Sequence, residues 1–180
     1  MMCTTVRFES PKEFWTQIVV PDFDDFTANI DSLRHAFHCA ISMFHMADWI
    51  YVSHNQNINK TFKFKDRKTS KLKDVSNEKE FANALSDNHP DFELIRQIAN
   101  TAKHLSLRSL SPHPNAPSNV ANTAVQSTGW GQGCWGQGPW GGTPRVMLAT
   151  SPGNSDLEFS DIANSVFQMW QMLNTQHGWG

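Results

Sequence analysis

The chain of 180 residues has few cysteines, a single tyrosine and no large excess of either charge. Cys3, Cys39 and Cys134 lie far apart and form no CxxC pair, which argues against a disulfide framework and a cysteine-based zinc site. No run of about 18 apolar residues is present, so no transmembrane helix is expected. The formal net charge of −2 predicts neither a nucleic acid nor a membrane as partner, so only an uneven distribution of charge can do so.

The first ten residues lack a basic patch followed by an apolar stretch, so we expect no signal peptide and a cytoplasmic protein. Apolar residues make up 39% of the chain and include 7 Trp and 12 Phe. This content is sufficient for a sizeable core in one domain, or in one domain with an appendage.

Capping signals and apolar spacing predict a mainly α-helical fold. Ser10 and Glu13 form a capping box with Pro11 at the first helical position, and this short helix is expected to end before Pro21. Asp22 is expected to cap a much longer helix.

The long helix is predicted over residues 22–52. From Ala36 onwards it is apolar on nearly every face, which is typical of a buried helix, so we expect it to be central. Residues 53–76 are expected to form a loop. Further helices are predicted over 77–86 and 90–107.

The C-terminal part differs in composition. Residues 109–129 carry three prolines and many small polar residues, so a linker or irregular wrap is expected there. Residues 145–150 and 157–159 are predicted to form a β-hairpin, followed by a closing helix over 161–174. The fold class is therefore mainly α: a helical bundle over 1–107, with the Pro/Gly/Trp-rich wrap, the hairpin and the closing helix of 108–180 packed on the same domain.

Two helices carry a polar stripe beside apolar positions. On the first helix, the stripe spans an arc of roughly 80° and consists of Arg34, His38, His45 and Asp48. On the later helix it consists of Glu93, Arg96, Asn100, Lys103 and His104. Burying such groups without partners costs about several kcal/mol of folding free energy each. We therefore expect them to face a polar cavity or one another. If the apolar faces share one core, the two stripes are predicted to meet in one cleft.

Such a cleft can perform acid–base chemistry on a phosphodiester without a cofactor. Histidine titrates near neutral pH, so His104 would exchange protons with His38 or His45. Arginine stabilises the charge of the transition state, a role assigned here to Arg96 and Arg34. Asn100 would orient the scissile group, and Asp48 completes the candidate catalytic set.

Two alternatives remain open for the same residues. The first is a divalent transition metal held by His38, His45, Asp48 and His104, because an i, i+3 pair on a helix can reach one ion. The second is a buried network that only sets helix packing, in which Asp48 and a histidine satisfy each other.

The segment RQIANTAKH, from Arg96 to His104, resembles the Arg-polar-x-x-x-His signature of HEPN domains. These are small helical bundles, and many are metal-independent ribonucleases of bacterial or phage defence systems that dimerise across the active site. The resemblance implies that Asn100 is the polar residue and His104 the catalytic histidine. Ala99 stands where the family has arginine, and Arg96, one turn earlier, is expected to substitute. The wider sequence is also similar to helical bacterial proteins without assigned chemistry.

A basic segment lies between the two striped helices. Its seven cations and single Asp66 give a charge of +6, which leaves −8 on the remainder of the chain. The cations are Lys60, Lys63, Lys65, Arg67, Lys68, Lys71 and Lys73. We expect Lys63, Lys65 and Arg67, together with Arg34 and Lys103, to bind RNA.

Two aromatic residues alternate with these lysines. Phe62 and Phe64 could stack on bases while the lysines contact phosphates. The same alternation is also typical of a strand that turns its phenylalanines towards the protein and its lysines towards water.

The repeat WGQGCWGQGPWGG places Trp130, Trp135 and Trp140 five residues apart. These rings are expected to wrap the bundle by docking in grooves, or else to form an exposed platform for a ligand. The leading hypothesis is thus an HEPN-like protein that binds or cleaves RNA. A metal-binding bundle and a non-enzymatic module that binds a partner protein are the alternatives, and no membrane partner is expected.

Overall fold

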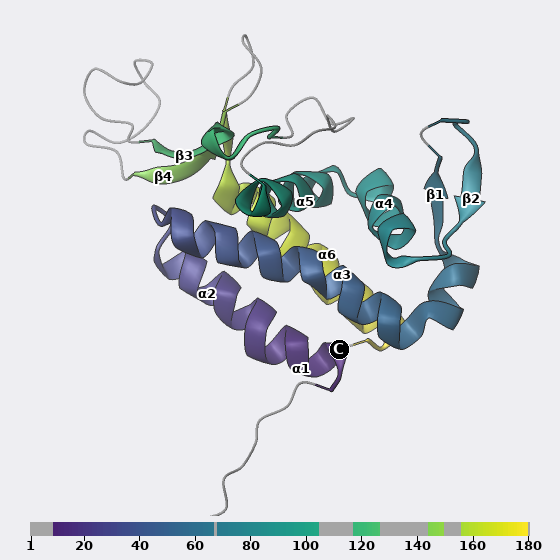
Figure 1. Cartoon of the computed structure of the whole chain (residues 1–180). Helices are drawn as coiled ribbons and strands as arrows, with labels where there is room; N and C mark the ends of the chain where they lie inside the picture. Colours follow the sequence, from purple (N-terminus) through teal and green to yellow (C-terminus); the bar gives the residue numbers. More distant parts are fainter. Residues whose placement is uncertain (1–8, 67, 105–116, 127–143, 150–155, 180) are drawn as a thin grey trace, which may run out of the picture.

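The structure is a computed structural model, which describes residues 9–66, 68–104, 117–126, 144–149 and 156–179. It confirms a mainly α-helical fold with a small C-terminal sheet and a closing helix (Figure 1). The α-helices are α1 (Pro11–Phe14), α2 (Val20–Ala28), α3 (Leu33–Thr61), α4 (Glu78–Asn88), α5 (Pro90–Lys103) and α6 (Phe159–His177). Among the described residues, no helix combines the length and the apolar content that crossing a bilayer requires.

The first helix does not end before Pro21 as predicted. Ser10 caps α1 as expected, since its hydroxyl accepts a hydrogen bond from the Glu13 backbone N–H. A π-helical turn, η1 (Trp15–Val19), then leads directly into α2. Pro21 is the second residue of α2, in a first turn where a residue without an N–H is tolerated.

The predicted 22–52 helix is in fact divided by a short turn. α2 ends at Ala28, and Ser32 caps the start of α3 by accepting from the His35 backbone N–H. α3 then continues to Thr61 across a kink at His54, whose φ of −130° and ψ of 21° are not helical. The prediction of a loop from residue 53 was therefore wrong, because buried Ile58 keeps the last turns of α3 on the core.

The loop prediction also missed a hairpin. β1 (Lys63–Lys65) pairs antiparallel with β2 (Leu72–Asp74). Figure 1 shows this hairpin beyond the C-terminal end of α3, beside α4.

The most enclosed helix is α5 rather than α3. Every residue of α5 from Phe92 to Ala99 is buried, and the helix packs against α3, α4 and α6. α3, by contrast, exposes one side to solvent along its length. The expectation that α3 is buried on every face was therefore wrong, but α3 is central as predicted, because it packs against α1, α2, α4, α5 and α6.

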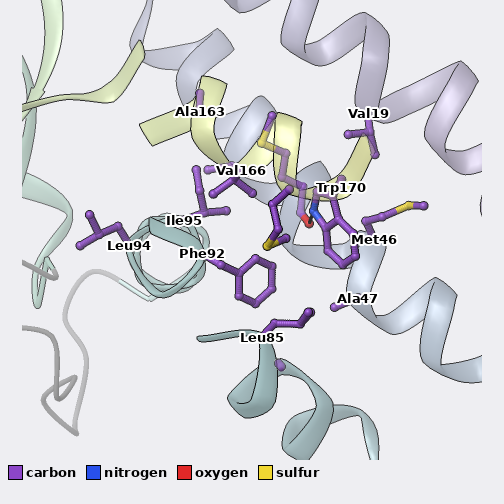
Figure 2. Packing of buried hydrophobic residues seen from close by; sticks show 14 of the residues in the cluster. Val19, Met46, Ala47, Leu85, Phe92, Leu94, Ile95, Ala163, Val166 and Trp170 are labelled. Carbon is purple, nitrogen blue, oxygen red and sulfur yellow. Dashed lines mark hydrogen bonds between the residues drawn. The ribbon is translucent and has the colours of Figure 1, made fainter. Parts of the chain in front are cut away.

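α6 closes the bundle against α3 and α5. The ring of Trp170 is fully buried, and its Nε1 donates a hydrogen bond of 3.1 Å to the Met43 carbonyl oxygen of α3. The same ring meets Phe92 of α5 edge to face, with centroids 5.8 Å apart. Figure 2 shows Phe92 and Trp170 among the buried side chains that fill the space between these helices.

The C-terminal sheet has three antiparallel strands instead of the predicted two. β4 (Arg145–Leu148) pairs with β5 (Leu157–Glu158), as the hairpin prediction required. β3 (Thr123–Gln126) pairs with the other edge of β4, although its residues were assigned to a linker. The short 3₁₀ helix η2 (Val120–Asn122) precedes β3.

Candidate functional site

The polar stripe of α3 lies on the solvent side of the helix. His45 Nδ1 and Asp48 Oδ2 are 3.0 Å apart, with 52% and 44% of their side chains exposed. Arg34 and His38 are also exposed, and Arg34 Nη2 lies 2.5 Å from Nε2 of the neighbouring His35. An exposed pair of this kind makes a small contribution to stability.

The polar residues of α5 divide into a buried and an exposed group. Arg96 is only 8% exposed, and its guanidinium binds Glu93 Oε2 at 2.5 Å and Asn83 Oδ1 at 2.8 Å. Gln97 donates to the other oxygen of Glu93 at 2.8 Å. The guanidinium that was expected to hold a phosphate is thus engaged inside the protein.

The remaining residues of the α5 stripe lie at the end of the helix. Asn100 is partly buried, Lys103 is exposed, and exposed His104 ends the helix with its N–H bonded to the Asn100 carbonyl oxygen at 2.9 Å.

The structure does not bring the two stripes together. On α3, the buried positions Ala36, Met43 and Ala47 lie about 180° around the helix from His38 and His45. It is this buried side that packs towards α5 and α6, because Met43 accepts the Trp170 hydrogen bond. The prediction of one shared cleft was therefore wrong.

The predicted metal ligands are also separate. Among the described ranges, no group of three His, Cys, Asp or Glu side chains is close enough to hold a metal ion. His38, His45, Asp48 and His104 therefore do not form the proposed ligand set. Cys39 is buried, and burial raises the pKa of its thiol far above the ordinary value, so it is not a poised nucleophile.

The exposure of His45 and Asp48 gives a testable expectation. Each of His45→Ala and Asp48→Ala should change the free energy of unfolding by less than about 1 kcal/mol, because water solvates both groups in the folded state. Urea denaturation of each variant measures this. A loss of several kcal/mol would instead show that the pair is buried in the working form of the protein.

The β1–β2 hairpin is the region where the structure brings several lysine side chains together. Its register places Lys63 opposite Asp74, Phe64 opposite Lys73, and Lys65 opposite Leu72. Because opposite residues share a face, Lys63, Lys65, Leu72 and Asp74 form the outer face.

The inner face joins the hairpin to the bundle. Phe64 is only 6% exposed, and β1 packs against α4. The backbone N–H of Lys65 donates to Asp87 Oδ2 of α4 at 2.6 Å. Phe64 thus turns inward from the strand, as the second interpretation of the Phe/Lys alternation requires, whereas Phe62 precedes the strand as the residue that ends α3 and is only partly buried.

Asp66 organises the turn between the two strands. Its Oδ1 accepts hydrogen bonds of 2.9 Å from the backbone N–H groups of Lys68 and Thr69, and its Oδ2 binds the Lys73 ammonium. The hydrogen bond from Lys73 and those from the turn hold the pKa of Asp66 well below its usual range. Ser70 closes the turn with a left-handed φ of 56°.

The cations of this segment are unequally neutralised. Lys63 pairs with Asp74 at 3.4 Å, and Lys73 pairs with Asp66. The other four described lysines are exposed and form no ion pair with another described residue: Lys60, Lys65, Lys68 and Lys71. Arg67 and the Trp-Gly repeat lie outside the described residues.

An aromatic cluster that no local sequence signal indicates lies at the kink of α3. Trp179 stacks on His177 with centroids 4.5 Å apart and approaches His54 at 6.0 Å and Phe62 at 5.9 Å. Beside it lies an open groove of about 490 Å³, lined by Glu9, Ser10, Pro11, Lys12, Ser53, His54, Gly178 and Trp179.

Comparison with known proteins identifies no relative: no protein-family model, no curated protein and no solved structure matches the chain.

Proposed function

We propose that the protein binds RNA through the β1–β2 hairpin and the adjoining end of α3. One observation carries the proposal: Lys60 at the end of α3 and Lys65, Lys68 and Lys71 on the hairpin stand exposed within one short stretch of chain, without ion pairs to the described residues. A dense group of unneutralised lysines attracts phosphates and releases their counterions, which favours binding to a nucleic acid.

The arrangement of the hairpin supports this role. Asp66 fixes the turn that carries Lys68, and Asp87 anchors the strand that carries Lys65. Lysines held on a fixed backbone lose less conformational entropy on binding than lysines on a flexible loop.

Binding should depend on the turn lysines. We expect the double variant Lys68→Ala, Lys71→Ala to bind RNA about 10- to 30-fold more weakly at low salt, since each ammonium–phosphate contact contributes about 1 kcal/mol in water. The slope of log K against log salt concentration should become shallower by about 2. Fluorescence anisotropy with a labelled RNA over a range of salt concentrations measures both quantities.

A matched control distinguishes an effect of the hairpin lysines on RNA affinity from an effect of the protein's net charge. Lys12→Glu changes the net charge by the same amount as the double variant, but Lys12 lies on α1. We expect the control to bind RNA like the wild-type protein. Equal weakening by both variants would contradict the proposal, because it would show that only overall charge matters.

The proposal is confined to binding, because buried Arg96 is engaged with Glu93 and Asn83. The HEPN-like cleavage suggested by the sequence stays a prediction that depends on exposed His104. Gel analysis of RNA after incubation with wild-type protein and His104→Ala tests it. Cleavage by the first and not the second would support a catalytic role for His104.

A further inference from the structure

We infer that the hairpin recognises the phosphate backbone of a double helix and does not read bases. This inference rests on the proposed function and specifies its ligand. It follows from which side chains the hairpin exposes and which it turns inward.

The aromatic side chains of the segment are not presented as a stacking platform. Phe64 is buried against the bundle. Phe62 is partly buried and meets Phe81 edge to face at 5.2 Å, with His177 and Trp179 at 5.6 Å and 5.9 Å. Phe64 is thus part of the core, and Phe62 packs against the core among other rings.

The outer face and the turn offer groups of a different kind. Lys65 extends from β1 beside the Lys63–Asp74 ion pair, and the described turn residues add Lys68, Thr69 and Lys71, all of them exposed. Ammonium and hydroxyl groups bind phosphate oxygens readily. Leu72, 71% exposed on the outer face, is aliphatic and has no ring to stack on a base.

These exposed side chains favour binding to a duplex over binding to a single strand. Proteins that bind single strands gain much of their affinity from bases stacked on aromatic rings, and the outer face of the hairpin provides no such ring. A duplex instead keeps its bases inside and presents about one phosphate charge per 1.7 Å of helix axis. Lysines without a stacking surface therefore gain most from the dense charge of a duplex.

Contacts limited to phosphates do not depend on base sequence. We therefore expect duplexes of unrelated sequence to bind with similar affinity. Duplex RNA and duplex DNA both present phosphates in this way, so a direct comparison of the two is needed to identify which duplex the protein binds.

The experiment compares three labelled probes of equal length with the full chain at one salt concentration: duplex RNA, duplex DNA and one RNA strand alone. We expect a duplex to bind at least about tenfold more tightly than the single strand. The single strand finds no ring on the hairpin on which to stack a base, and the duplex presents the denser phosphate charge. The duplex that binds more tightly, RNA or DNA, is then identified as the preferred ligand. The Lys68→Ala, Lys71→Ala variant should lose most of this difference, and Lys12→Glu should keep it.

Three results would overturn the inference in distinguishable ways. Single-stranded RNA bound as tightly as the duplexes would refute duplex recognition and leave RNA binding intact. No binding to any of the probes would refute the proposed function as well. A strong preference between the duplex RNA and a second duplex RNA of unrelated sequence, measured in the same way, would refute recognition of phosphates alone.

Discussion

Replacing Trp170 by alanine should lower the free energy of unfolding by about 3–5 kcal/mol, the range for removal of a large buried aromatic side chain. The indole is fully enclosed where α6 meets α3 and α5, and its Nε1 hydrogen bond ties α6 to the backbone of α3. Neighbouring helices cannot close over so large a gap, so the lost contacts with Phe92 are not replaced. Urea denaturation followed by circular dichroism measures the change.

Met172→Ala is the control for this experiment. Met172 lies on the same helix two residues away but is 60% exposed, so its loss should change the free energy of unfolding by about 0.5 kcal/mol or less. A small effect at both positions would mean that α6 does not close the core in the way described.

Arg96→Ala should cost about 3–5 kcal/mol of unfolding free energy, because it breaks the buried ion pair that Arg96 forms with Glu93. The same change should leave RNA affinity at the hairpin unaltered in the folded protein. Measuring stability and RNA binding on one preparation separates a structural role for Arg96 from a phosphate-binding role.

A paired replacement sharpens this prediction. Glu93→Leu combined with Arg96→Met removes both charges at once, so it should be less destabilising than Arg96→Ala alone. If Arg96→Ala were harmless to stability and instead abolished RNA binding, the assignment of Arg96 to an internal network would be wrong.

Local signals predicted the helices best where the chain carries its own start signals. Ser10, Asn77 and Pro90 each mark a helix start that the structure confirms, because capping depends on residues within one turn. Pro21 misled the prediction, since its position after a π-helical turn makes it compatible with a continuing helix. β3 was missed because its partner β4 lies more than 18 residues further along the chain.

The candidate site shows the same limit of sequence reasoning. The stripes of α3 and α5 were correctly recognised as polar arcs, but helical spacing gives only which residues share a face. Which face meets a neighbour depends on packing: α3 turns Met43 to the core and His45 to water. Arg96 also looked available, since nothing in its local sequence indicates that Asn83 of α4 would bind it.

The basic segment was the most informative signal for function. Its charge and its alternation of lysine and phenylalanine are visible in the sequence, and they are compatible both with phenylalanines that stack on RNA bases and with phenylalanines that face the protein. Only the burial of Phe64 and the packing of Phe62 distinguish these alternatives. That distinction changes the expected ligand from stacked bases to phosphates.

The most direct test of the account is to map, residue by residue, the surface that we propose binds RNA. Backbone amide signals of the isotopically labelled protein can be followed by NMR while duplex RNA is added at low salt. We expect the largest shifts between Lys63 and Asp74, with the signals of His38 and His45 unchanged. Shifts centred on His38, His45 and His104, with the hairpin signals unmoved, would contradict it.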